Sequence, residues 1–226
     1  MISIIMPIYN GVEFFEEAYG SVLNQTFEDW ELVIAINGHK DSEEDSDVYK
    51  FVKEKTKGEP RVTAYDLEIK GYPDTLNFLI QNSKFDYVAV LDVDDKWHPD
   101  KLRKQAPHLG EYDIVGTNCQ YFGDSTISPR LIMGSIHNSV FWQFNTMIHS
   151  SVVVRKELHY YDTSLPGRVD YDMWLRLASQ GKKFFNISEI LTFHRVYSNS
   201  YFNTRGHTKE FKSVEEKLKS KWRNST

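Results

Sequence analysis

The sequence predicts an α/β domain built around a mostly parallel sheet. Short apolar and β-branched runs alternate with segments in which apolar residues recur every three or four positions. Such alternation is typical of right-handed β-α-β units, which form parallel sheets covered by helices. One run, 87–91, ends in the three carboxylates of Asp92, Asp94 and Asp95. Ligands of open α/β sheets bind beyond the carboxyl ends of the strands, so we expect the functional site there.

The length and composition allow a sizeable core. The chain has 226 residues, of which 40% are hydrophobic and 14% aromatic, enough for one large domain or two small ones. No stretch approaches the roughly 20 apolar residues that span a bilayer. Residues 1–7 lack the basic leader of a signal peptide, so we expect a cytoplasmic protein. The single cysteine, Cys119, excludes an internal disulfide framework and a cysteine-based zinc site.

The net charge of −5 is unevenly distributed. Residues 205–226 contain seven Lys or Arg and three Glu, and subtracting this +4 from −5 leaves −9 for the rest of the chain. An acidic body argues against nucleic-acid binding over a broad surface. Within this basic segment, four apolar residues predict an amphipathic helix over 206–226. They are Phe211, Val214, Leu218 and Trp222. Its apolar row either packs on the body or rests on an anionic membrane as a peripheral contact.

The first half of the chain supplies four strands and four helices. β-branched and apolar runs bounded by turn residues predict strands over 3–8, 30–36, 61–65 and 87–91. Apolar residues at helical spacing predict helices over 12–22, 41–57, from 71 onward, and over 99–105. Pro73 fits the first turn of the third helix, where its missing N–H costs little.

In the second half the alternation is interrupted. Apolar runs predict strands over 113–122, 150–154 and 184–193, and helical spacing predicts a helix over 170–178. Between 123 and 144, Gly, Ser, Pro, Asn and aromatic residues mix without a period. Long loops in compact domains are often functional, so we expect irregular structure over the site.

The acidic cluster has the chemistry of a cation site. Asp92 and Asp94 alternate with Val93, so in an extended strand their carboxylates share one side, and Asp95 follows in the turn. Hard oxygen ligands suit Mg²⁺ or Mn²⁺ holding a phosphate-bearing substrate. The alternatives are a solvated acidic turn, or Asp95 acting as a cap near the helix at Pro99.

Four segments, in order, resemble the family 2 glycosyltransferases with the GT-A fold. Segment 3–10 with 21–32 resembles the family's opening, and 91–95 followed by 99–102 looks like its aspartate motif. Residues 149–155 and 170–177 match further motifs in the same order. The resemblance covers roughly residues 2–200 and implies a single Rossmann-like domain with a mixed, mostly parallel sheet flanked by helices.

The resemblance also implies an activity. It implies a metal-dependent glycosyltransferase of the hexosyl type, which moves a sugar with inversion from a nucleotide-diphosphate donor, a UDP-sugar being favoured. The acceptor hydroxyl would lie on a glycan, lipid or protein, with contacts from the irregular segment 123–148, and the cation would be Mn²⁺ or Mg²⁺. By this likeness, 1–110 is the nucleotide-sugar-binding half, 111–205 the acceptor and catalytic half, and 206–226 the C-terminal amphipathic helix.

Individual residues take donor-site roles from the motifs. Pro7 and Tyr9, after the first strand, and Asn37, at the tip of the second, would hold the base. Tyr9 offers an aromatic face of the kind that stacks on nucleobases. Asp94 matches the position that ligates the metal, and Asp92 would assist there or bind the ribose.

The later motifs supply the catalytic residue and a basic contact. Asp170 matches the family's catalytic base, although the residues alone favour a helix N-cap at this position. Asp172 is its nearest rival. Arg195 resembles a basic residue near the donor phosphates, and His194 is either a metal ligand or a structural histidine.

Three positions depart from the family pattern. Asn37 stands where an aspartate usually reads the uracil imide, Val169 replaces a glutamate beside the base, and Leu76 replaces an arginine. These changes leave an inactive nucleotide-sugar or glycan-binding module as one alternative. A sugar nucleotidyltransferase is the other, but residues 7–11 are not the glycine-rich basic loop it would usually carry.

Overall fold

The computed structural model describes residues 1–41, 44–69, 71–198 and 209–223. Its strands are β1 (Ile2–Ile8), β2 (Trp30–Asn37), β3 (Val62–Leu67), β4 (Tyr87–Val90), β5 (Lys96–Trp97), β6 (Ile114–Gly123), β7 (Gly134–Ile136), β8 (Val153–Arg155) and β9 (Phe184–Val196). Its α-helices are α1 (Phe15–Leu23), α2 (Asp47–Lys55), α3 (Tyr72–Gln81), α4 (Lys101–Gln105), α5 (Val169–Ser179) and α7 (Lys209–Arg223). Short 3-10 helices are η1 (Val12–Phe14), η2 (Ala106–His108), η3 (Asn138–Trp142), η4 (His149–Ser151) and η5 (Lys156–Leu158).

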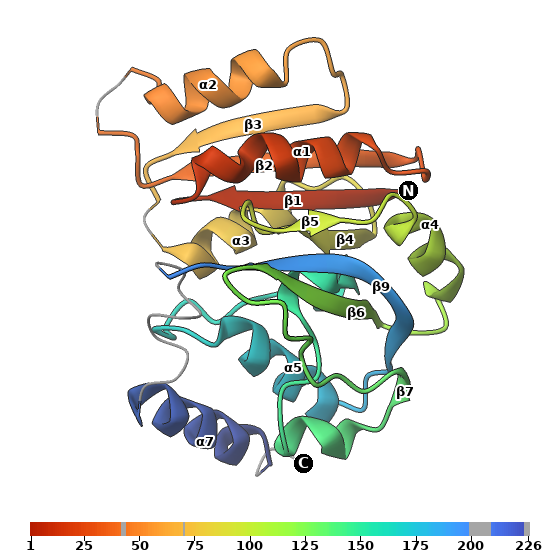
Figure 1. Cartoon of the computed structure of the whole chain (residues 1–226). Helices are drawn as coiled ribbons and strands as arrows, with labels where there is room; N and C mark the ends of the chain where they lie inside the picture. Colours follow the sequence, from red (N-terminus) through yellow and green to blue (C-terminus); the bar gives the residue numbers. More distant parts are fainter. Residues whose placement is uncertain (42–43, 70, 199–208, 224–226) are drawn as a thin grey trace.

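The strands of the described residues join one mixed sheet, in which β1, β2 and β3 lie side by side (Figure 1). The strand order is β3-β2-β1-β4-β8-β6-β9-β5, and β7 pairs with β9 beside this path. The long ladders β1–β2, β2–β3 and β6–β9 are parallel, whereas β8 runs antiparallel to β4 and β6. The predicted single α/β domain around a mixed, mostly parallel sheet is therefore confirmed.

Two apolar layers cover the sheet because successive side chains of a strand point to opposite faces. Ile4 and Met6 of β1 pack with Phe15 of α1, while Ile5 packs on the other face with Leu76 of α3. Every residue of β1 is buried, as expected for a parallel strand covered on both sides. The carboxyl ends of β1, β2 and β4 consequently open at one edge of the sheet.

The second half differs from the prediction in two places. Segment 123–144 is less irregular than expected, because it contains β7 and η3, and β7 pairs antiparallel with the start of β9. The strand predicted over 150–154 begins only at Val153, because residues 150 and 151 belong to η4. A three-residue strand and a single helical turn are too short to produce a sequence period.

The C-terminal helix α7 packs on the body beside α5 (Figure 1). Leu218 is buried in the core, and Val214 and Trp222 pack against that core. The Trp222 indole donates to the Asp172 carboxylate over 2.7 Å. Of the two alternatives for the apolar row, packing on the body therefore holds for Val214, Leu218 and Trp222. The side chain of Phe211 lies outside the described residues. Among the described helices, none has the length and apolar character needed to cross a membrane.

Candidate active site

The acidic cluster lies at the carboxyl end of β4, in a turn. Strand pairing ends at Val90, and the backbone N–H of Asp95 donates to the Asp92 carbonyl over 3.0 Å. The expectation that Asp92 and Asp94 share one side of an extended strand is therefore wrong. The turn directs each carboxylate to a different set of partners.

Asp92 is held by side chains from two other elements, α3 and η4. Its carboxylate accepts hydrogen bonds from Tyr72 at 2.6 Å and Ser150 at 3.1 Å, and His149 Nδ1 lies 3.2 Å away. Burial raises the pKa of Asp92, but His149 and these hydroxyl donors lower it more, and the resulting pKa is about 2. Asp92 is therefore ionised at neutral pH and fixed in orientation.

Asp95 is buried and ties the turn to β9. One of its oxygens accepts from the Arg195 N–H at 2.9 Å, and the other lies 3.0 Å from His194 Nδ1. Burial lowers the pKa of His194, but Asp95 and its neighbouring carboxylates raise it to about 9, so this histidine is cationic at neutral pH. Asp95 does not cap the helix near Pro99. Its contacts give both Asp95 and His194 a structural role in joining β9 to the turn.

Among the three carboxylates of the turn, Asp94 has the fewest hydrogen-bond donors from the described residues of other elements. Its donors among the described residues are the Tyr197 hydroxyl and its own backbone N–H. Burial and the charges of Asp95 and Asp92 raise the pKa of Asp94 to about 7, despite the opposing effect of His194. The site therefore has an excess of negative charge centred on this side chain.

This donor set fits a cation that is shared with a substrate. In the parts of the chain that the structure describes, no three His, Cys, Asp or Glu side chains converge on one point. Mg²⁺ usually binds through one or two carboxylates, several waters and substrate phosphates instead of a complete protein cage. Asp94, together with the nearby Asp92, could supply the one or two carboxylates of such a cation site.

Arg195 lies directly behind Asp94. Its Nε donates to the Asp94 carbonyl at 2.9 Å, and its guanidinium pairs with Glu17 of α1. The aromatic rings of Phe14 and Phe122 sandwich it at 4.2 and 4.3 Å. A guanidinium packed in this way is a fixed positive charge close to the acidic turn.

The adjoining strand tips form the predicted base-binding region. Pro7 is buried within β1, and Tyr9 just beyond it is half exposed. Asn37, the last residue of β2, is 1% exposed, and its Oδ1 has no hydrogen-bond donor among the described residues. Gly38 has a φ of +78°, and a Cβ there would lie 2.7 Å from the Tyr9 ring. Tyr9 therefore rests on a glycine backbone, beside a buried acceptor that lacks a partner.

Asp170 is the second residue of α5 and is not its N-cap. The N-cap is Arg168, whose φ of 59° lies in the left-handed region. The Asp170 carboxylate accepts a hydrogen bond from Asn145 at 3.3 Å. Burial lowers the pKa of His149, but Asp92 and then Asp170 raise it, leaving it above its ordinary value. The negative charges of Asp92 and Asp170 thus both raise the pKa of His149, although the two residues are far apart in sequence.

Asp172, the rival base, is 2% exposed and bound to α7. Its Oδ1 accepts from Trp222 at 2.7 Å and from Lys221 at 3.4 Å. These contacts give Asp172 a structural role in holding the C-terminal helix.

Sequence reasoning assigned no role to the side chains that surround Asp92. Tyr72 begins α3, and His149 begins η4 within a motif that carried no individual role. His149 Nε2 lies 2.7 Å from the Tyr161 hydroxyl, and His159 Nε2 lies 2.8 Å from the same hydroxyl. Only the folded chain brings these residues together, and no spacing in the sequence signals it.

His159 provides a test of this buried network. Burial is the main cause that holds the pKa of His159 well below its usual range, so the folded protein keeps it neutral. Below pH about 6.5 the unfolded chain takes up a proton that the folded chain does not, and stability falls. Between pH 6.5 and 5.5 the unfolding free energy of the wild type should fall by about 1 kcal/mol more than that of His159→Gln. Urea titration at each pH measures both values. An identical pH dependence in both proteins would contradict a neutral His159.

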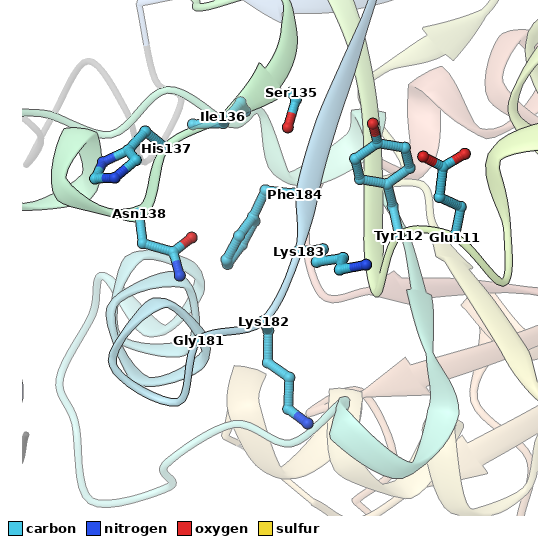
Figure 2. Close-up of a pocket in the computed structure, with 10 residues that line it drawn as sticks. All are labelled: Glu111, Tyr112, Ser135, Ile136, His137, Asn138, Gly181, Lys182, Lys183 and Phe184. Carbon is cyan, nitrogen blue, oxygen red and sulfur yellow. The ribbon is translucent and has the colours of Figure 1, made fainter.

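Two hollows flank the second half of the sheet. One, of about 460 Å³, lies at the amino ends of β6 and β9 and is lined by residues including Glu111, Lys182 and Lys183 (Figure 2). The other, of about 580 Å³, is lined by Asn145 and Arg168 among others. Because Asn145 binds Asp170, the second hollow adjoins the acidic site, whereas the first lies at the opposite ends of the strands.

Comparison with known proteins identifies the family. Residues 3–171 match the sequence profile of Glycosyl transferase family 2. The chain belongs to this family. It is 29% identical over 210 residues to the O-antigen biosynthesis glycosyltransferase WbnJ of Escherichia coli, covering 88% of this chain and 81% of WbnJ. The chain covers only 33% of a longer uncharacterized glycosyltransferase of Rickettsia bellii, at 26% identity and over 98% of its own length.

Solved structures support the GT-A fold. The crystal structure of S. aureus TarS 1-349 in complex with UDP-GlcNAc superposes with a TM-score of 0.75 at 15% identity, covering 96% of this chain and 65% of that one. The mannosyltransferase PcManGT from Pyrobaculum calidifontis, in complex with GDP-Man and Mn²⁺, gives a TM-score of 0.67 at 16% identity, covering 90% and 59%.

Proposed function

We propose that this glycosyltransferase moves a sugar from a UDP-sugar to an acceptor hydroxyl, with inversion and with help from Mn²⁺ or Mg²⁺. The observation that carries the proposal is the meeting of two acidic centres at one edge of the sheet. Asp92 lies in the turn after β4, and its carboxylate contacts His149. Asp170 lies on α5, and its charge, like that of Asp92, raises the pKa of the same histidine. This proximity supports a donor phosphate site and a proton acceptor that lie close together.

The donor base fits the strand tips. The buried Oδ1 of Asn37 accepts no hydrogen bond from the part of the chain that the structure describes, and the imide N–H of uracil is a donor of the required kind. The exposed ring of Tyr9 supplies a stacking surface beside it. TarS, which has the same fold, was solved with UDP-GlcNAc, and this supports a uracil nucleotide as the donor.

The cation fits Asp94. When bound, it would neutralise the donor phosphates and the charge that develops on the leaving nucleotide. Asp94 would hold it and Asp92 would support it, because the diphosphate would otherwise meet a cluster of carboxylates. The Mn²⁺ in the PcManGT complex supports this assignment.

Asp170 is proposed as the base. The acceptor oxygen attacks the anomeric carbon from the face opposite the diphosphate, and Asp170 takes the hydroxyl proton. The bond between the anomeric carbon and the phosphate oxygen breaks, and the electron pair leaves with the nucleoside diphosphate. Asn145, bound to Asp170 at 3.3 Å, orients the carboxylate. Attack from the opposite face inverts the anomeric centre.

The acceptor is proposed to be a glycan, free or linked to a lipid or a protein. WbnJ is named for O-antigen biosynthesis, which supports a glycan acceptor for this chain as well.

The direct test is release of nucleoside diphosphate from a panel of UDP- and GDP-sugars with Mn²⁺ or Mg²⁺. We expect turnover of a UDP-sugar that stops when EDTA removes the cation. Absence of release from every donor, together with absence of metal-dependent UDP binding, would contradict the proposal.

Gly38→Ala tests the base-binding region. The added Cβ would lie 2.7 Å from the Tyr9 ring, so Tyr9 must move, and we expect UDP affinity to fall about tenfold or more in calorimetric titration. Gly58→Ala is the matched control. Gly58 has a similar φ of +89° but no atom within 4 Å of the added Cβ, so the backbone strain is shared without the displacement. Equal UDP affinity in the two variants would contradict a role for Tyr9.

A further inference from the structure

The hollow beside Asp170 is lined by cationic and aromatic side chains. Of about 580 Å³, it includes Arg130 and Phe144 from the 123–148 segment, Tyr121 from β6, and Arg168 at the start of α5. Asn145 lines it as well and binds the Asp170 carboxylate. If Asp170 accepts the proton of the attacking hydroxyl, the rest of the acceptor must extend into adjoining space, and this hollow provides it.

The charge of the hollow is opposite to that of the chain. Its lining contains two arginines and no Asp or Glu, although the protein carries a net charge of −5. Arg130 is exposed, and no ion pair to it is found among the described residues. Its guanidinium lies 4.7 Å from the centre of the Phe144 ring. A guanidinium stacked on a ring keeps its in-plane N–H groups available, and their geometry matches the two oxygens of a carboxylate or phosphate.

Hydrogen bonds from β9 hold the backbone next to Arg130 and Phe144. The buried amide of Asn186 in β9 donates to the carbonyls of Ile132 and Thr146, each over 2.9 Å. The Thr146 hydroxyl accepts the Ile132 N–H at 2.6 Å and joins the two segments directly. Arg130 and Phe144 are therefore presented by fixed backbone, which reduces the ordering cost of binding a ligand.

Arg168 is held by the C-terminal helix. Its guanidinium lies 3.7 Å from Glu215 of α7, and Lys219 pairs with the same carboxylate at 3.0 Å. Its φ of 59° is unusual for a residue other than glycine. Strained backbone of this kind is frequent at binding sites, where surrounding contacts maintain it. Here it turns the chain so that Arg168 lines the hollow two residues before Asp170.

We propose that the acceptor is an anionic glycan, and that the hollow binds its carboxylate or phosphate group through Arg130, with Arg168 contributing positive charge. This inference rests on the proposed sugar transfer, because it assigns the acceptor side of the same site. The arginines also offset the repulsion that an anionic acceptor would meet on approaching Asp170 and the acidic turn.

The test measures acceptor-side binding without nucleotide, so it is independent of the donor assignment. A galacturonate trisaccharide, a glycerol phosphate trimer and neutral maltotriose are titrated calorimetrically into the full chain at 150 mM NaCl. We expect at least one anionic probe to bind tenfold or more tightly than maltotriose. Arg130→Gln should weaken that probe about tenfold and leave maltotriose unchanged. The preferred anionic probe distinguishes a carboxylate from a phosphate ligand.

Lys183→Gln is the matched control, because it removes one positive charge from the other hollow (Figure 2). It should leave all three affinities unchanged. Equal binding of neutral and anionic probes, absence of binding by every probe, or equal losses in Arg130→Gln and Lys183→Gln would overturn the inference. UDP binding, measured separately, reports on the proposed donor site, so failure of one assignment is distinguishable from failure of the other.

Discussion

Asp170→Asn is expected to lower kcat for sugar transfer by about 10²- to 10⁴-fold, the range typical of a missing general base. Asparagine keeps the size of the side chain and can still pair with Asn145, but it cannot take the acceptor proton. Donor binding should be preserved, because Asp170 lies on α5 and is not one of the residues proposed to hold the base or the cation. The measurements are kcat with the preferred donor and acceptor, and UDP affinity by calorimetry.

Asp172→Asn is the control on the same helix. Asp172 is buried and accepts hydrogen bonds from Trp222 and Lys221, so weakening these contacts should cost about 1–3 kcal/mol of unfolding free energy. Its kcat, measured where the protein remains folded, should stay within a few-fold of wild type. A large loss of kcat in Asp172→Asn with near-normal kcat in Asp170→Asn would reverse the two assignments.

Much of the fold could be predicted, because strands and helices that bury a whole face carry a clear pattern of apolar residues in the sequence. All seven residues of β1 are buried, and the inward positions of α3, including Leu76 and Leu79, recur at helical spacing. The short elements β7 and η4 could not be predicted in this way. The three residues of β7 are strand only because β9 lies beside them, and this pairing is between segments remote in sequence.

The candidate site shows the same limit. Asp92, Asp94 and Asp170 were predicted from a strand end and from motifs, and their catalytic roles stay predictions. The different hydrogen-bond partners of the individual carboxylates could not be predicted. It depends on Tyr72 and His149 turning toward Asp92 and on His194 turning toward Asp95, from three separate elements. The start of α5 was also misplaced by one residue, because the left-handed Arg168 precedes it.

Asp94→Asn is expected to lower metal-dependent turnover by about 100-fold or more. Electrostatic stabilisation of developing charge is worth several kcal/mol, and each 1.4 kcal/mol is tenfold in rate. The neutral amide would hold Mn²⁺ weakly, so UDP binding should also lose its dependence on the cation. Asp100→Asn is the matched control, because this partly exposed carboxylate pairs with Arg103 outside the site. A Mn²⁺ dependence unchanged in Asp94→Asn would contradict the metal assignment.

The same substitution should make the metal-free protein more stable. Burial and the adjacent Asp95 and Asp92 raise the pKa of Asp94 to about 7, above the value near 3.9 for an unfolded aspartate. The unfolded chain therefore gives up this proton at lower pH than the folded chain does, and stability falls as pH rises toward 7 and stays low above it. At pH 8 in EDTA, Asp94→Asn should unfold at a higher temperature than wild type, and saturating Mn²⁺ with UDP should reduce this difference. A purely structural carboxylate would show the opposite result, a lower unfolding temperature on neutralisation, because its hydrogen bonds favour the ionised form.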